Sequence, residues 1–340
     1  MENIKKTSAP RRSSLELLRI FCMFFIVAHH FGLHGQYGDM QMSQFNSFII
    51  MVLSAGGKLG VNVYILISGY FLVNSKFKLK RLVNTVLLTI FYSVSVYLAL
   101  VLIVPELQFS GTDFVASLFA IKNDAYWFVT CYVAMVILSP FINKLIHVLN
   151  HREHLILIAI LVFMQLELYG YVTYFPLSQI AWFITLYIIA GYLRKYPNKF
   201  LQSKLITGIA SLVFCTVIAV TYMTGMTNIV CILTALSLFC FFNNLNIKTN
   251  KFVNLISKTT FAIYLIHDNN FMRAYLWKDF LNCPLHAQYN TFWIFSIAAI
   301  LLVFISCSLI ELIRINVTSL IMLPVKAHLH KKKQKGNESA

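Results

Sequence analysis

Arg19 and His30 place a cation and a titratable imidazole in an otherwise apolar stretch near the start of the chain. In a helix, eleven residues at about 100° each bring both side chains onto one face, roughly 16 Å apart along the axis. Ionisable side chains are costly in a membrane-spanning helix and usually mark a substrate or proton site. The stretch therefore predicts chemistry at this face. Arg19 could also extend to lipid phosphate or pair with Glu16, three residues earlier.

A second segment with chemical potential runs over 60–71 and is followed by a basic cluster at 76–81. The small residues Ser68 and Gly69 let helices approach closely, so helix packing alone explains them. The basic cluster could orient its helix at the inner membrane surface. It could also hold the phosphates of an anionic cofactor.

Two further segments place aromatic or ionisable side chains at predicted helix ends. The first, over 261–268, ends in His267 and Asp268, and the second is Tyr126-Trp127-Phe128. Aromatic side chains at this depth are usually interfacial anchors, and a helix end dipping into the interface would explain the imidazole and the carboxylate. A substrate-binding role is the alternative for both segments.

These side chains require membrane-spanning helices to position them. Of the 340 residues, 59% are hydrophobic and 12% are charged. A soluble domain of this length needs far more polar surface, so we predict an all-α, polytopic integral membrane protein. Apolar runs of about twenty residues predict about ten transmembrane helices, at 14–34, 48–73, 82–104, 126–147, 154–171, 178–194, 205–225, 228–245, 254–272 and 291–323.

The distribution of basic residues predicts the topology. With the N-terminus in the cytoplasm, the large majority of the 28 Lys and Arg residues fall in inner segments, as the positive-inside rule requires. The exceptions in outer loops are Lys58, Lys122, Arg273 and Lys278. Both termini are therefore predicted to be cytoplasmic. We divide the chain into a basic N-terminal segment at 1–13, a membrane domain at 14–323, and a basic, disordered cytoplasmic tail at 324–340.

Charge, cysteine spacing and residue spacing argue against a nucleic-acid partner, a disulfide framework and a metal site. The net charge of +16 serves topology and attraction to anionic membrane lipids, and its spread over separate inner segments argues against a nucleic-acid partner. The seven cysteines have no paired or CxxC spacing, so no disulfide framework is predicted. No metal-ligand spacing occurs, and we expect no metal.

In this order, the four segments resemble the membrane-bound acyltransferase-3 family, whose members transfer acyl groups to surface carbohydrates. The family's first helix carries an arginine, ten residues and a histidine, as Arg19 and His30 do here, usually with an acid such as Glu16 before the arginine. Its second helix carries a Gly-Val-x-x-Phe motif followed by Ser-Gly-Tyr or Ser-Gly-Phe, leading to cytoplasmic basic residues. The matching residues here are Gly60, Val61, Ser68, Gly69 and Tyr70, with Lys80 and Arg81 at the basic end. The resemblance covers roughly residues 14–323.

The resemblance implies an O-acetyltransferase of the stand-alone type in a bacterial plasma membrane. An acyl group, with acetyl as the first candidate, would move from cytoplasmic acetyl-CoA to a hydroxyl of a cell-surface polysaccharide or its lipid-linked precursor. Such a transfer needs a base and stabilisation of an oxyanion. The expected catalytic residues are His30 as the base, with Arg19 and Glu16. The expected CoA-binding residues are Arg19, Lys80 and Arg81, and the expected substrate-binding residues are His267, Tyr264 and Trp127.

A polytopic transporter or flippase for a lipid-linked glycan or small molecule is the alternative function. It too would explain ionisable side chains within membrane helices. Transporters commonly show internal repeats, and none is evident here. The acceptor sugar, the leaflet on which it is modified, and the choice between direct transfer and a covalent intermediate stay open.

Overall fold

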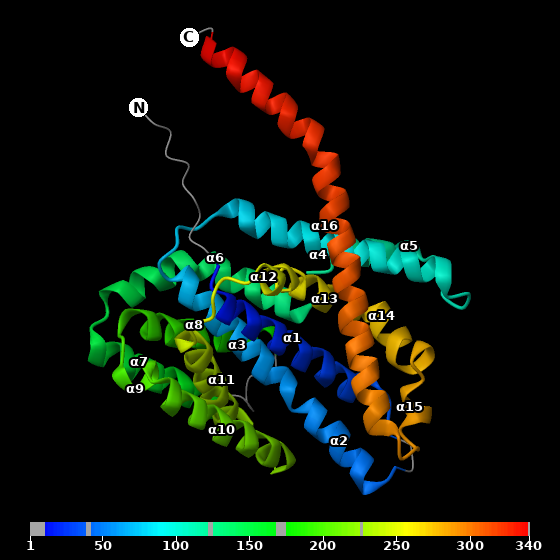
Figure 1. The fold of residues 1–340 in the computed structure, drawn as a ribbon, viewed down its shortest axis with the longest axis horizontal. Helices are drawn as coiled ribbons and strands as arrows, with labels where there is room; N and C mark the ends of the chain where they lie inside the picture. Colours follow the sequence, from blue (N-terminus) through cyan, green and yellow to red (C-terminus); the bar gives the residue numbers. More distant parts are fainter. Residues whose placement is uncertain (1–10, 39–41, 122–124, 168–174, 225–226, 339–340) are drawn as a thin grey trace.

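In a computed structural model of the protein, the structure describes residues 11–38, 42–121, 125–167, 175–224 and 227–338, and these residues form helices without any strand (Figure 1). The predicted all-α class is confirmed. The longer helices are α1 (Ser13–His34), α2 (Gln44–Ser54), α3 (Gly56–Leu72), α4 (Leu79–Ile103), α6 (Trp127–Val148), α7 (His151–Glu167), α8 (Phe175–Lys195), α10 (Lys204–Thr224), α11 (Thr227–Asn244) and α16 (Phe292–Glu338). The short ones are α5 (Gly111–Leu118), α9 (Lys199–Gln202), α12 (Lys251–Ile256), α13 (Thr260–His267), α14 (Asn270–Tyr275), the π-helix η1 (Leu276–Phe280) and α15 (Cys283–His286).

Six stretches of the described residues are long and apolar enough to cross a membrane. They are Ser13–His34, Gln44–Leu72, Leu79–Ile103, Trp127–Val148, Leu177–Lys195 and Phe292–Ile321, and Lys204–Ile218 and Ile229–Asn244 are shorter apolar helices. Large apolar side chains such as Leu102 and Ile313 face outward on these helices, as contact with lipid requires. The count of about ten spans, the cytoplasmic termini and the domain boundaries stay predictions.

The predicted span at 254–272 is wrong in one respect, because the structure divides this stretch into α12, α13 and α14. The hydroxyls of Thr259 and Thr260 donate to the carbonyls of Ile256 and Ser257, which offers the backbone an alternative to the continuous helical ladder. His267 is consequently the last residue of α13, and Asp268 is its C-cap. A short helix thus presents both side chains at its end.

Close packing of α1 against α3 fixes the position of the first helix. A Cβ atom at Gly60 would lie 2.9 Å from the Cys22 carbonyl oxygen and 2.8 Å from Ile26, so no larger residue fits there without a shift. The break between α2 and α3 leaves the Ser54 carbonyl bonded to His29 Nδ1. The first half of α1 packs into a core with α3, α6, α8 and α11, and its second half into a core with α4, α13 and α16.

The last helix extends beyond the other helices, as Figure 1 shows. Glu311 accepts two bonds from Arg314 and one from Tyr92 of α4, which fastens α16 to the bundle. The tail at 324–340 was predicted to be disordered, but α16 continues through it to Glu338. Five of these residues are Lys, which favours a helix.

Candidate active site

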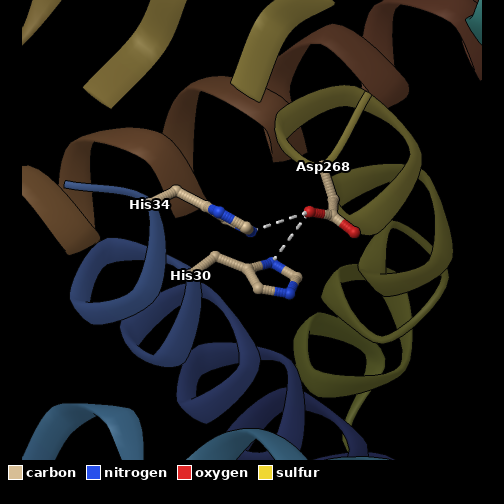
Figure 2. A group of neighbouring side chains, drawn as sticks. All are labelled: His30, His34 and Asp268. Carbon is tan, nitrogen blue, oxygen red and sulfur yellow. Dashed lines mark ion pairs between the residues drawn. The ribbon is translucent and has the colours of Figure 1, made fainter. Parts of the chain in front are cut away.

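The C-terminal half of α1 carries His30, whose Nδ1 lies 2.8 Å from Nε2 of His267. His267 Nδ1 lies 2.6 Å from the Ile263 carbonyl oxygen, which can only accept a hydrogen bond. In neutral His267 the proton is therefore on Nδ1, and Nε2 accepts. His30 must then donate through Nδ1, which leaves the lone pair of its Nε2 available. This nitrogen lies on the side of the ring away from Asp268 (Figure 2).

Asp268 is the centre of the polar cluster around His30. Its Oδ1 accepts from Arg273 Nε at 3.0 Å and lies 2.9 Å from the second guanidinium nitrogen, Nη2. The same oxygen lies 3.5 Å from His30 Nδ1 and 3.7 Å from His34 Nε2, so both rings turn toward it (Figure 2). The Asp268 side chain is 1% exposed. A buried carboxylate needs such a counter-ion, and Arg273 supplies it.

The segment around Asp268 is held in place by Tyr126 and Asn269. The Tyr126 hydroxyl donates to the Leu265 carbonyl at 2.8 Å and accepts from the Asn269 amide at 2.8 Å. The Asn269 side-chain oxygen in turn caps α14, on which Arg273 lies. The first residue of the Tyr-Trp-Phe segment thus positions the end of α13, a structural role that its place beside two aromatic residues did not reveal.

His30, His34 and Asp268 also have the composition of a metal site, with ligand atoms within 4.8 Å of one another. However, Asp268 Oδ1 is already bonded to Arg273, and His30 Nδ1 is bonded to His267. A divalent cation would have to displace the guanidinium group and the imidazole partner. The cluster is therefore better suited to proton exchange than to metal binding.

His30 lines a cavity of 320 Å³ whose walls are largely aromatic and apolar. Small-molecule sites commonly combine such walls with a few converging polar groups. The lining residues are Met23, Ile26, His29, His30, Leu33, His34, Gly57, Lys58, Val61, Asn62, Tyr64, Trp127, Phe128, Gln179, Trp182, Phe261, Tyr264, Asp268 and Arg273. Of the predicted substrate-binding residues, Trp127 and Tyr264 are in this wall. His267 is fully buried behind it and reaches the cavity through His30.

Arg19 and Glu16 lie at the other end of α1 and do not line the cavity. Arg19 Nη1 is 3.0 Å and 3.1 Å from the two Glu16 carboxylate oxygens. Glu16 also accepts from Ser257, and the Tyr64 hydroxyl donates to the Arg19 carbonyl at 2.9 Å. The ion pair considered from the sequence is confirmed. The structure does not bring the pair into contact with His30.

The predicted CoA-binding residues Lys80 and Arg81 differ in their surroundings. Arg81 lines a separate cavity of 110 Å³, together with Lys76 and Lys78, whereas Lys80 does not line it. Tyr132 lines this second cavity and stacks on Phe128 with ring centroids 6.0 Å apart. Because Phe128 lines the His30 cavity, residues one turn apart on α6 contribute to the walls of the two cavities.

Sequence reasoning did not assign three of the residues at the His30 cavity. His34 lies one helical turn after His30, and this spacing could have revealed it. Arg273 was assigned only to an outer loop. Its partner Asp268 lies five residues earlier, a spacing that does not bring two side chains together on one helix, and the bend between α13 and α14 makes the contact. Lys58 was assigned in the same way, but its ammonium lies 4.6 Å from the Trp182 ring centroid in the cavity wall.

Helices suited to a membrane, a largely apolar cavity and an imidazole with an available lone pair define a membrane protein suited to proton-transfer chemistry. The acyltransferase-3 family model, described as an acyltransferase domain, matches residues 12–311. The chain belongs to this family and is a membrane acyltransferase. Comparisons with curated proteins and with solved structures gave no match.

Proposed function

We propose that this protein is a membrane O-acyltransferase that moves an acetyl group from cytoplasmic acetyl-CoA to a hydroxyl of a cell-surface polysaccharide or its lipid-linked precursor. The observation that carries the proposal is His30, whose Nε2 is left as a hydrogen-bond acceptor at the wall of a 320 Å³ cavity. The family membership supplies the acyl-transfer class. The acceptor class and a bacterial plasma membrane as the location rest on the resemblance of the motifs.

In the proposed reaction, the acceptor hydroxyl oxygen attacks the thioester carbonyl carbon while His30 Nε2 takes the hydroxyl proton. The tetrahedral intermediate collapses, the carbon–sulfur bond breaks, and the CoA sulfur leaves with the proton from His30. Asp268, 3.5 Å from His30 Nδ1, favours the imidazolium that forms between these two steps. His267 holds the ring in the productive tautomer, and Trp127 and Tyr264 contact the substrates.

The phosphates of CoA are proposed to bind at the basic cavity of Lys76, Lys78 and Arg81. Guanidinium groups bind phosphate through two parallel hydrogen bonds, which favours Arg81 as the main contact. Arg19 does not line this cavity, so its predicted contact with CoA stays a prediction. The pantetheine arm would then extend past Tyr132 and Phe128 toward His30.

Transfer of a labelled acetyl group tests this function directly. Purified protein in lipid vesicles is given acetyl-CoA labelled in the acetyl group, together with a lipid-linked saccharide. We expect label on the saccharide and an equal amount of free CoA. Movement of intact saccharide across the vesicle membrane without transfer of label would identify a transporter or flippase instead.

Substitution of Arg81 and of Lys80 compares the contributions of these two basic residues to acetyl-CoA binding. Arg81→Gln is expected to raise the KM for acetyl-CoA by about tenfold, equivalent to about 1.4 kcal/mol, because a charge-assisted phosphate contact is lost. Lys80→Gln, outside the cavity lining, is the matched control and should change this KM less than about twofold. The measurement is the initial rate of CoA release against acetyl-CoA concentration. Equal effects of the two substitutions would contradict the assignment of Arg81.

A further inference from the structure

Tyr264 is a rigidly packed residue in the wall of the His30 cavity. It lies on α13, three residues before His267, and is 5% exposed. Its ring packs edge-to-face against Tyr126 and Phe128, with centroid separations of 5.9 Å and 5.7 Å. These two contacts hold the ring in place.

The Tyr264 hydroxyl is buried without a hydrogen-bond partner among the described residues. A buried polar group left in this state costs about 1–3 kcal/mol, which folded proteins usually avoid. The group therefore indicates a missing acceptor atom that a bound molecule would supply.

The position of this hydroxyl distinguishes it from other unsatisfied groups. In the described part of the chain, five more buried side-chain atoms lack a partner, on Tyr37, Asn46, Ser117, His154 and Trp277. None of these five residues lines the His30 cavity. Tyr264 thus combines an unused donor with a place in the wall of the cavity that His30 also lines.

We propose that the Tyr264 hydroxyl donates a hydrogen bond to the carbonyl oxygen of the acyl thioester and stabilises the oxyanion of the tetrahedral intermediate. This role rests on the proposed acyl-transfer function. When the acceptor oxygen attacks the carbonyl carbon, the π electron pair moves to the carbonyl oxygen, and the bond from Tyr264 strengthens as the negative charge develops. Collapse of the intermediate returns this pair to the carbonyl and expels the CoA sulfur. Tyr264 keeps its proton throughout.

Tyr264→Phe tests this role, because it removes one oxygen atom and leaves the ring contacts in place. We expect kcat to fall by about 10²–10³-fold, as for other single oxyanion donors, with each KM changed less than about threefold. Thermal stability should stay the same or rise, because the removed group had no partner. The matched control is Tyr37→Phe, which removes another unpartnered buried hydroxyl outside the cavity and should leave kcat unchanged.

CoA release from acetyl-CoA without any acceptor separates this proposal from the proposed function. Attack by water passes through the same oxyanion, so Tyr264→Phe should slow this side reaction by a similar factor. If wild type cleaves acetyl-CoA slowly but acetylates no saccharide, the acceptor assignment fails and a slow Tyr264→Phe variant still supports the oxyanion donor. Unchanged kcat in Tyr264→Phe, an effect confined to the KM of the acceptor, or a wild type that never releases CoA would each overturn it.

Discussion

Replacing His30 with glutamine is expected to lower kcat for acyl transfer by about 10²–10⁴-fold, the usual contribution of a general base. A glutamine amide can still donate to His267 Nε2, which accepts from His30 Nδ1 in the wild type. It cannot take up the proton of the attacking hydroxyl, because an amide is not basic near neutral pH. The substitution therefore removes proton transfer while keeping much of the local packing. The measurement is the initial rate of CoA release with both substrates saturating.

His154→Gln is the matched control for this experiment. His154 is a fully buried histidine on α7 whose Nε2 lies 3.0 Å from the Ile188 carbonyl oxygen, and it does not line the His30 cavity. Its substitution removes an imidazole from the helical bundle in the same way, but it should leave kcat within about twofold of wild type. If His30→Gln keeps a near wild-type kcat, His30 is not the base.

The first helix was the part of the site that local patterns described best. The interval between Arg19 and His30 predicted a separation of roughly 16 Å along one helix, and α1 does span both residues. This separation places the two side chains toward opposite ends of the helix. The structure agrees, since Arg19 pairs with Glu16 at the far end and only His30 lines the cavity.

The partners of His30 could not be derived from the sequence in the same way. Asp268 faces His30 because the chain leaves the helical path around Ser257–Thr259 and bends again between α13 and α14. A hydropathy pattern averages over such short interruptions, so 254–272 was predicted as one helix. Arg273 lies five residues after Asp268 and reaches it through the second bend. The contact of Asp268 with His30, in contrast, joins segments far apart in the chain.

The last prediction with a large effect concerns the ion pair of Asp268 and Arg273. Asp268→Asn leaves the guanidinium charge of Arg273 beside His30 and His34 without its counter-ion. Breaking a buried pair in this way costs about 3–5 kcal/mol, and the 30% exposure of Arg273 places the effect at the lower end, roughly 3 kcal/mol. We expect a clear fall in the thermal unfolding temperature in detergent. We also expect kcat to fall by roughly 10²-fold, because the imidazolium on His30 loses its favourable charge.

The double variant Asp268→Asn with Arg273→Gln decides between a catalytic and a purely structural role for the pair. It removes both charges, so no unpaired ion stays buried and most of the lost thermal stability should return. The carboxylate that favours the His30 imidazolium is still absent, so kcat should stay about as low as in Asp268→Asn alone. Thermal stability and kcat should therefore separate in the double variant. If both recover together, the pair holds α13 and α14 in place and does not assist proton transfer.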